Sequence, residues 1–359
     1  MIYYIIFLLL YPLLFILSFF RKKPTNNLVI QTAKIGDYVN TSIMFEPLNK
    51  SDVVIDKVNI VFSQYDSRIN RVLIINEYKK NIISKMQLAF KIFFNNYQNV
   101  YIVMPNSYNL FLGQMSFSNN KTTLSTYTDK WYTKILTLRM KKIKHSVNDL
   151  TLDSYLKLIN PNFTHKNFIK TIQKPIIKSD YKFISTSTFN IGVSLTAANK
   201  LKTIDIQTWI DIFNILDTFE CNIYIFGLEN ENSLYKNLIN SITIKNLKII
   251  SLLGNIDLKY LPYEISKMNL YISSDTGNSY IADAMKVPTI NFAGPCFWME
   301  QRPVLKESLI IKSNACCVPY SSVFKTEHQE KCNDIFTIYN KQKKDIEAFI
   351  TKIYKDFQF

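Results

Sequence analysis

The sequence predicts an α/β protein in which two doubly wound domains follow one N-terminal transmembrane helix. From Asn27 onward, short apolar runs typical of strands alternate with longer helical patterns, and the alternation restarts near residue 190. A chain of 359 residues, 47% of them hydrophobic, is long enough for about two domains and too apolar to be disordered. The first twenty residues carry no charge.

This uncharged N-terminal segment is followed at once by Arg21-Lys22-Lys23. Twenty helical residues span about 30 Å, which is the thickness of the hydrocarbon core of a bilayer. No small-residue cleavage site follows, so a cleaved signal peptide is disfavoured. Residues 1–23 are therefore expected to form a single-pass anchor in the cell inner membrane, with the body in the cytoplasm by the positive-inside rule. A buried core helix is the alternative interpretation.

The first predicted domain covers residues 24–178, and a stretch around residues 171–188 is expected to link it to the second. The pattern predicts strands followed by helices, as in parallel α/β units. The expected strands are Leu28–Thr32, Lys57–Val61, Arg71–Ile75 and Val100–Met104, and the expected helices are Asp37–Leu48 and Ile83–Asn95.

The second predicted domain covers residues 179–335, and residues 336–359 are expected to form a C-terminal helix. The expected strands are Asn190–Leu195, Asn222–Phe226, Lys248–Leu252, Leu270–Ser273 and Thr289–Phe292, with a helix over Asp205–Phe219. Of only seven glycines, five follow predicted strands: Gly36, Gly227, Gly254, Gly277 and Gly294. Ligands of open parallel sheets bind outside the carboxyl ends of the strands, so these glycines predict a binding edge.

The composition limits the class of partner. Lys and Arg number 43 against 28 Asp and Glu, and the resulting net charge of +15 favours anionic partners. No nucleotide-binding Gly-Lys-Ser/Thr motif and no RNA-binding aromatic motif is present, so no nucleic acid is expected as partner. A basic run from Arg139 to His145 is either a solvated face or a contact for acidic lipids or a phosphorylated acceptor.

The five cysteines are odd in number and irregularly spaced, which predicts reduced thiols and no disulfide framework. Cys316, Cys317, His328 and Cys332 fit no zinc spacing, so no metal site is expected there. None of the three histidines, His145, His165 and His328, falls at a predicted strand end.

The strongest local motif runs from Ser273 to Tyr280, with the sequence SSDTGNSY. A strand ends here, and small polar residues open a helix that Asp275 or Thr276 can cap. The backbone amides of Gly277 and Asn278 would then face outward beside the positive end of the helix dipole. This arrangement predicts a seat for a phosphate group, with an ordinary helix N-cap as the alternative.

A second motif, Ile35-Gly36-Asp37, places a carboxylate directly after the first strand. A carboxylate at this position acts either as a general base or as a helix cap, and the spacing alone leaves both roles open.

Val29–Thr41 (VIQTAKIGDYVNT) together with Tyr271–Pro295 (YISSDTGNSYIADAMKVPTINFAGP) resembles glycosyltransferase family 9, the lipopolysaccharide heptosyltransferase group. Weaker similarities lie at Lys202–Asp205 with Trp209, at Gly227 with Glu231, and at Leu253-Gly254. The resemblance implies the GT-B architecture, in which two Rossmann-like domains face a cleft. The first domain would then lie on the acceptor side, and the second would bind the nucleotide sugar.

The resemblance also implies roles for individual residues. Asp37 would take the proton from the acceptor hydroxyl, Lys202 or its neighbour Lys200 would neutralise the diphosphate, and Glu231 would bind the ribose. Backbone amides of Thr276 and Gly277 would hold the phosphates. The complete set of expected donor-binding residues is Ser194, Thr196, Lys200, Lys202, Glu231, Asp275, Thr276, Gly277, Asn278 and Ser279.

The implied reaction is an inverting, metal-independent sugar transfer without a cofactor. The expected donor is ADP-heptose, and the expected acceptor is a lipopolysaccharide or related glycan at the cytoplasmic membrane face. One residue departs from the family pattern, because Tyr280 stands where the family has histidine. This leaves another donor sugar open. It also leaves open an inactive binding or scaffold protein with the same fold.

Overall fold

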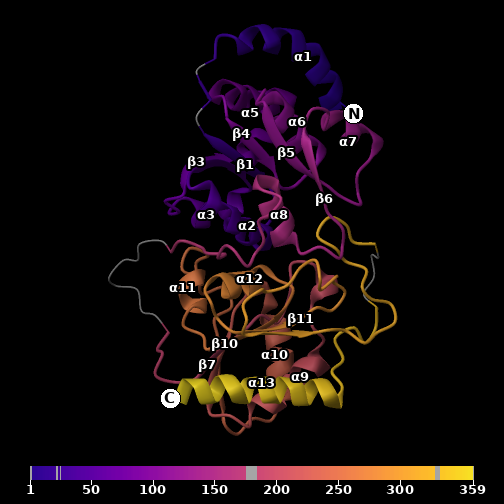
Figure 1. Ribbon diagram of the computed structural model, residues 1–359. Helices are drawn as coiled ribbons and strands as arrows, with labels where there is room; N and C mark the ends of the chain where they lie inside the picture. Colours follow the sequence, from indigo (N-terminus) through magenta and orange to yellow (C-terminus); the bar gives the residue numbers. More distant parts are fainter. Residues whose placement is uncertain (1, 22, 25, 175–183, 328–331, 359) are drawn as a thin grey trace. The chain divides into compact units, whose positions relative to one another are not determined.

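The computed structural model describes residues 2–21, 23–24, 26–174, 184–327 and 332–358. The chain forms two compact units, Met1–Gln173 and Lys174–Phe359, each built around one six-stranded parallel sheet (Figure 1). Residues 175–183 of the predicted linker, and His328, lie outside the described residues.

The sheet of the first unit has the strand order β3-β2-β1-β4-β5-β6, and every neighbouring pair is parallel. Its central strands are buried on both faces, as expected for a parallel sheet covered by helices. The strands are β1 (Asn27–Gln31), β2 (Ser51–Ile55), β3 (Ile69–Ile74), β4 (Asn99–Ile102), β5 (Asn120–Ser125) and β6 (Lys141–Lys144).

Two groups of helices pack in this unit. Helices α5 and α6 contact each other, as do α2 and α8. The helices are α2 (Ile35–Thr41), α3 (Phe45–Leu48), α4 (Ile60–Ser63), α5 (Ile82–Asn95), α6 (Ser107–Met115), α7 (Trp131–Leu136) and α8 (Thr151–Ile159), with 3-10 turns at Ser42–Met44, Lys57–Asn59 and Ile75–Tyr78.

The strand predicted over Lys57–Val61 is wrong. Asp56 accepts a hydrogen bond from the Val58 amide (3.2 Å) and thereby starts a 3-10 turn, which continues into α4. The strand lies earlier, as β2. Its second residue, Asp52, interrupts the apolar pattern, yet it is buried and accepts a hydrogen bond from the Tyr97 hydroxyl (2.9 Å).

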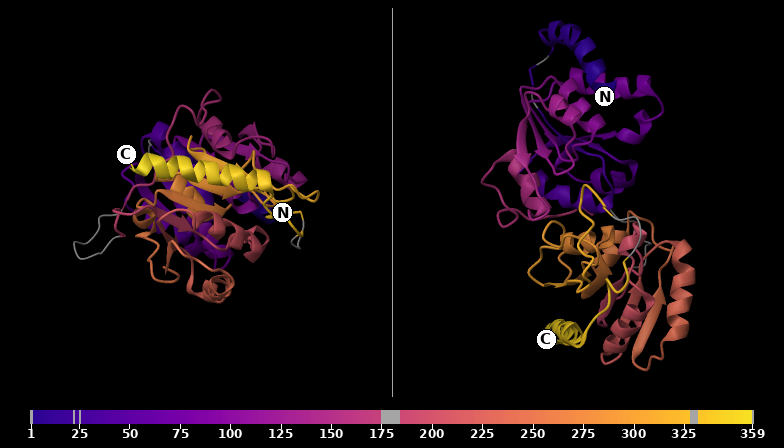
Figure 2. Two further views of the ribbon diagram at one scale, coloured as in Figure 1. Left: turned by 90° about the horizontal axis from the view of Figure 1, so that it is seen from below. Right: turned by 90° about the vertical axis from the view of Figure 1, so that its right-hand side faces the viewer.

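The N-terminal segment forms α1 (Ile2–Ser18), a helix of 17 residues. No helix in the described part of the chain is both long and apolar enough to cross a bilayer, so the predicted transmembrane helix is not confirmed. Instead α1 packs on α6 within the first unit (Figures 1 and 2). Leu14 is fully buried there and joins the hydrophobic core of that unit.

The second unit repeats the same topology, with the parallel order β12-β11-β10-β7-β8-β9. Counted from the first strand of each unit, both sheets have the doubly wound order 3-2-1-4-5-6. The strands are β7 (Asn190–Val193), β8 (Cys221–Ile225), β9 (Leu247–Ser251), β10 (Leu270–Ser274), β11 (Thr289–Phe292) and β12 (Ser308–Ile311).

Helices α9 and α10 pack together with the C-terminal helix on one side of this unit, and α11 packs on α12. The helices are α9 (Ile206–Leu216), α10 (Asn232–Ser241), α11 (Leu261–Ile265), α12 (Gly277–Ala284) and α13 (Asn340–Gln358), with 3-10 turns at Lys200–Lys202 and Glu229–Glu231. The apolar stripe of α13, made by Ile346, Ile350 and Ile353, is buried in the core.

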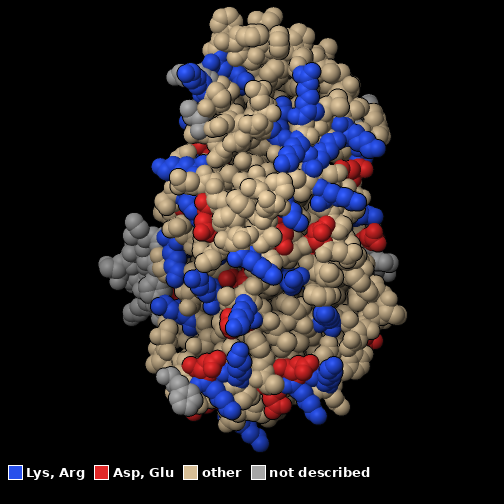
Figure 3. All heavy atoms as spheres, in the orientation of Figure 1, with Lys and Arg blue, Asp and Glu red and all other residues tan. Residues whose placement is uncertain are grey.

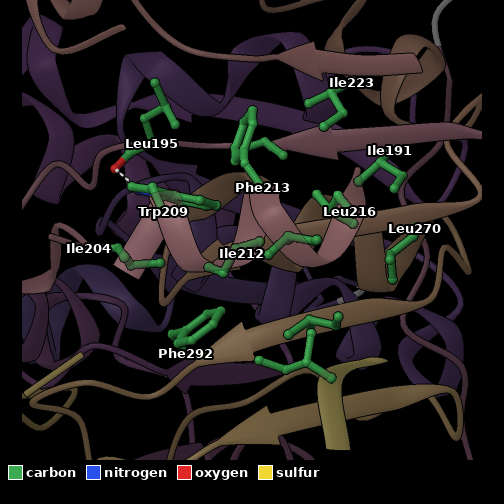
Figure 4. Close-up of a cluster of buried hydrophobic side chains, with 14 of the residues drawn as sticks. Ile191, Leu195, Ile204, Trp209, Ile212, Phe213, Leu216, Ile223, Leu270 and Phe292 are labelled. Atoms are coloured by element: carbon green, nitrogen blue, oxygen red, sulfur yellow. Dashed lines mark hydrogen bonds between the residues drawn. The ribbon is translucent and has the colours of Figure 1, made fainter. Parts of the chain in front are cut away.

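Trp209 on α9 anchors the second core (Figure 4). Its ring is fully buried, and its Nε1 donates to the carbonyl of Leu195 (3.4 Å). Leu195 and Ile204 are buried in the same cluster. The loop between them is therefore held at both of its ends, which fixes the place of Lys202.

The prediction that all cysteines are reduced thiols is wrong for two of them. Cys317 and Cys332, which lie 15 positions apart in the sequence, form a disulfide. The spacing of the cysteines alone does not reveal this pairing. Cys221 and Cys296 are buried thiols, and Cys316 is an exposed thiol. Among the described residues, no three His, Cys, Asp or Glu side chains are grouped to hold a metal ion.

Candidate functional site

The predicted donor-site residues gather at one edge of the second sheet. The chain order reverses between β7 and β10, since β8 and β9 extend the sheet on one side and β11 and β12 on the other. Such a switch point leaves a crevice at the carboxyl ends of the two central strands. Ser194 and Thr196 follow β7, and the Asp275–Ser279 segment follows β10.

Lys202 and Asp275 form a buried ion pair at this edge. The Nζ of Lys202 donates to Asp275 Oδ2 at 2.5 Å, and the two side chains are only 15% and 5% exposed. The Tyr280 hydroxyl donates to the other carboxylate oxygen, Oδ1, also at 2.5 Å. Tyr280, the residue that departs from the family pattern, thus forms a hydrogen bond with Asp275, the partner of Lys202.

These contacts decide the charge of Asp275. Burial alone would raise its pKa, but Lys202 and the hydrogen bonds from Lys202, Tyr280 and Cys296 outweigh that effect and hold the pKa below its usual value. Burial also raises the pKa of the Cys296 thiol, so it stays protonated and donates to Asp275 Oδ2 at 3.4 Å. The site therefore contains a stable carboxylate and a positively charged lysine.

Helix α12 begins beside this pair. Thr276, and not Asp275, is the N-cap, and it forms a capping box with Ser279. Gly277 and Asn278 are then the first two helical residues, whose amides have no acceptor within the helix. They lie at the positive end of the helix dipole, next to the cation of Lys202. The arrangement can bind an anion such as a diphosphate.

A chain of hydrogen bonds joins the two strand ends. Asn278 Nδ2 donates to Ser194 Oγ (3.0 Å), which is also bonded to the buried Tyr271 hydroxyl (2.7 Å). A Cβ atom at Gly192 would lie 2.5 Å from the Tyr271 ring, so glycine leaves room for this ring. Thr196 is half-buried in the loop after β7.

Glu231 lies in the 3-10 turn that follows β8, against Gly227. Its Oε1 accepts the amide of Leu228 (2.9 Å), while Oε2 is buried without a hydrogen-bond partner among the described residues. A Cβ atom at Gly227 would lie 2.7 Å from Oε1, so glycine permits this close approach. A buried carboxylate oxygen without a donor fits a ligand hydroxyl group.

Asp37 lies at the corresponding edge of the first sheet, whose order reverses between β1 and β4. It is the third residue of α2 and is half-buried. The N-cap of that helix is Lys34, which makes no side-chain capping bond. Asp37 is therefore not the N-cap residue but the third residue of the helix, and its role as base or cap stays a prediction.

The structure brings together Lys202, Asp275, Ser194 and Asn278, and it places Lys200 in an exposed position. The sequence interpretation missed Tyr271 and Cys296. The place of Cys296, just after β11 and Gly294, could have revealed it as a strand-end residue. The prediction that no histidine lies at a strand end is wrong for His145, which directly follows β6. This side chain is buried, and its Nδ1 forms a hydrogen bond with Ser154 Oγ (2.8 Å).

Comparison with known structures supports this fold. A family 9 glycosyltransferase from Veillonella parvula aligns with 92% of this chain and 98% of its own, with a TM-score of 0.67 and 14% identity. ADP-heptose lipopolysaccharide heptosyltransferase II of E. coli aligns with 93% of this chain and 100% of its own (TM-score 0.64, 12% identity). E. coli heptosyltransferase WaaC with ADP aligns with 92% of this chain and 100% of its own (TM-score 0.64, 13% identity).

At these identities the three likenesses show the fold alone, and it is consistent with the GT-B architecture. A search of curated proteins found no match. The family model described as glycosyltransferase family 9 (heptosyltransferase), in contrast, matches residues 129–331, which is more than half of the chain. The chain therefore belongs to glycosyltransferase family 9, the heptosyltransferases, and is a glycosyltransferase.

Proposed function

We propose that this chain transfers a heptose from ADP-heptose to a lipopolysaccharide or related glycan, with inversion at the anomeric carbon and without a metal ion or other cofactor. The observation that carries the proposal is the Lys202–Asp275 pair at the start of α12. It places a fixed positive charge beside backbone amides at the switch point of a sheet, where a nucleotide diphosphate binds in folds of this type.

The donor would be held by three groups of the second unit. Lys202 and the first amides of α12 would neutralise the diphosphate, and the unpartnered Oε2 of Glu231 would accept a ribose hydroxyl. As the bond between the anomeric carbon and the diphosphate breaks, negative charge grows on the leaving oxygen. A preorganised cation and helix terminus stabilise that charge without reorganisation.

The acceptor would be activated by Asp37 of the first unit. An acceptor hydroxyl attacks the anomeric carbon, its proton passes to the Asp37 carboxylate, and the nucleoside diphosphate leaves. One displacement of this kind inverts the configuration. The half-buried position of Asp37 in the first turn of α2, just after the carboxyl end of β1, supports the role of base.

We place this reaction at the cytoplasmic face of the inner membrane. Support comes from the basic composition and from the uncharged N-terminal segment with Arg21 and Lys23 after it. The acceptor would then be a lipid-linked or lipopolysaccharide glycan at the same surface.

The test is an assay of ADP release from ADP-heptose with a lipopolysaccharide acceptor that lacks its heptose. We expect release that depends on the acceptor, survives a metal chelator, and yields a product of inverted configuration by NMR. Thermal shifts with ADP, UDP and GDP would rank the nucleotides, and a preference for UDP or GDP would overturn the ADP-heptose assignment.

The same assay distinguishes the proposed enzyme from an inactive scaffold protein. In such a scaffold, Asp275 would stay paired with Lys202 at all times, and the hydrogen bond from Tyr280 would keep Asp275 in place. That alternative predicts thermal stabilisation by ADP but no ADP release with any nucleotide sugar. Transfer that stops on addition of a chelator and returns with a divalent metal would overturn metal independence alone.

A further inference from the structure

Helix α1 is fixed to the first unit along one face. Tyr3 packs against Tyr108 and Phe111, with ring centroids 5.3 and 5.2 Å apart. Beyond its end, the Arg21 guanidinium donates to the carbonyls of Phe93 (3.0 Å), Ser116 (2.8 Å) and Phe117 (3.1 Å). The helix is thus docked at both ends of its length.

The opposite face of α1 is apolar and exposed. Its most exposed side chains include Leu9 (75%), with Phe19 (72%) and Phe20 (82%) just beyond the helix. In Figure 3 the region over α1, at the top of the view, is almost without charged side chains, and Lys and Arg side chains lie next to it. An apolar surface of this kind beside basic residues is typical of helices that lie in the membrane interface.

A pocket of about 820 Å³ lies between α1 and the rest of the first unit. Its apolar wall contains Phe7, Tyr11 and Phe15 of α1. Its described lining also contains four basic side chains, Arg21, Lys23, Lys121 and Arg139, and no acidic one. An apolar wall next to a polar rim whose charges are all positive matches a molecule with a hydrocarbon chain and an anionic head.

Three details of the basic rim fit an anion. Arg21 Nε is buried and has no hydrogen-bond partner among the described residues. Arg139 is held over α1 by a bond from its Nη1 to the Tyr11 hydroxyl (3.0 Å). Burial, with Arg139 and Arg21 nearby, lowers the pKa of Lys121 to about 8, so a bound anion would restore its full charge.

This pocket is not the crevice of the proposed reaction. Besides α1, its lining includes residues that directly precede β1, β4 and β5, such as Pro24, Gln98 and Asn119. It therefore lies at the amino ends of these parallel strands. Asp37 follows the carboxyl end of β1, at the opposite edge of the same sheet.

We propose that α1 lies in the membrane interface while docked on the first unit, and that the pocket beneath it binds an anionic phospholipid. The lipid phosphate contacts Arg21, Lys121 and Arg139, and the adjoining part of an acyl chain lies along Phe7, Tyr11 and Phe15. This inference rests on the membrane placement proposed above, and it is independent of the sugar chemistry.

The first test measures binding of the full-length chain to phosphatidylcholine vesicles with and without phosphatidylglycerol. Each basic residue near an anionic surface contributes about 1 kcal/mol, so Lys121→Gln/Arg139→Gln should weaken binding to the anionic vesicles by about 30-fold. The matched control is Lys141→Gln/Lys142→Gln, which removes the same charge from the exposed strand β6 outside the pocket. Equal losses in both variants would overturn the pocket and leave only diffuse attraction.

Two further measurements locate the lipid and the helix. Phosphatidylglycerol with a photoreactive group near the head of its acyl chain should label Phe7, Tyr11 or Phe117, and labels confined to Leu9, Phe19 and Phe20 would overturn the pocket. Alkaline carbonate should release the chain from membranes, whereas a chain that stays behind would show that α1 spans the bilayer.

The outer face is tested by Leu9→Gln/Phe20→Gln, which changes exposed side chains and should leave the thermal unfolding temperature unchanged. Binding to both kinds of vesicle should fall, and undiminished binding would overturn the interfacial placement. ADP binding by every variant serves as a control on the second unit. A chain that binds vesicles as expected but transfers no sugar would refute the proposed function and not this inference.

Discussion

The switch points of the two sheets share one backbone topology and differ in what their residues contact. In the second unit Asp275 is buried and accepts hydrogen bonds from Lys202, Tyr280 and Cys296. In the first unit Asp37, in the first turn of the helix after β1, is half-buried and does not occupy the capping position. The same strand order thus presents one carboxylate held in a buried ion pair and another that is half-buried in the first turn of a helix. The contrast indicates that burial and partners, not topology, assign the chemistry.

The largest expected effect comes from Asp37→Asn, which removes the proton acceptor and keeps the shape of the side chain. Turnover should fall by about 10²–10⁴-fold, because a positioned base supplies that factor. ADP binding and thermal stability should barely change. Steady-state ADP release measures the effect, and Glu77→Gln, at an exposed acid of the same unit, is the control. Full turnover in Asp37→Asn would remove Asp37 from the role of base.

The variant Asp275→Ala tests the importance of the ion pair in the second unit, because it leaves the largely buried Lys202 without its carboxylate partner. Breaking one side of a buried pair costs about 3–5 kcal/mol, so the second unit should unfold at markedly lower denaturant concentration. The double variant Lys202→Met/Asp275→Asn removes both charges together and should recover most of that stability. Similar losses in the single and double variants would mean that packing, and not the charge pair, is responsible.

The same double variant tests whether Lys202 and the start of α12 bind the diphosphate. Without the Lys202 charge, affinity for ADP should fall about 10- to 100-fold, while affinity for adenosine stays the same, because hydrogen bonds to a charged group contribute about 1.5–3 kcal/mol. Isothermal titration calorimetry with both ligands gives the ratio. Lys200→Met is the matched control at an exposed lysine two residues away. If that control carries the loss, Lys200 and not Lys202 contacts the diphosphate.

The smallest effect concerns pH. The pKa of Asp275 is depressed in the folded chain, so its contribution to stability is present above its unfolded pKa, near about 4, and is lost as pH falls through the folded value. One such group changes the unfolding free energy by at most about 1.4 kcal/mol per pH unit. Below pH 4 the wild type should lose stability more steeply than the double variant. Parallel curves would show that Asp275 is not depressed.

The sequence predicted β1, β3, β4 and the strands β7 to β11 well, and it missed β2, β5, β6 and β12. The strand expected over Thr289–Phe292 coincides with β11, which carries Ile290 and Phe292 on one face and is flanked by Pro288 and Gly294. Strands β5 and β6 were missed, since Asn120–Ser125 is largely polar and Lys141–Lys144 contains three lysines. Strand β6 is the edge strand of its sheet and is exposed on one side, so its pattern resembles a charged loop.

In the candidate site, too, the sequence predicted some features and missed others. Asp275 was identified from a local motif and Lys202 from the family resemblance, whereas their ion pair joins residues 73 positions apart in the chain. No local pattern contains that contact, because it arises only when β7 and β10 become neighbours in the sheet. The buried hydroxyl of Tyr271 went unnoticed for the same reason, since its partner Ser194 follows another strand.

The two hydrophobic cores have a consequence for calorimetry. The cluster around Trp209 is made entirely within the second unit, and the cluster around Phe93 entirely within the first. Each unit can therefore melt as its own cooperative block, and a single melting temperature does not describe a chain with two such blocks. A heat-capacity scan should resolve two peaks. ADP raises only the peak of the unit that binds it, so the scan assigns each ligand to its unit without any substitution.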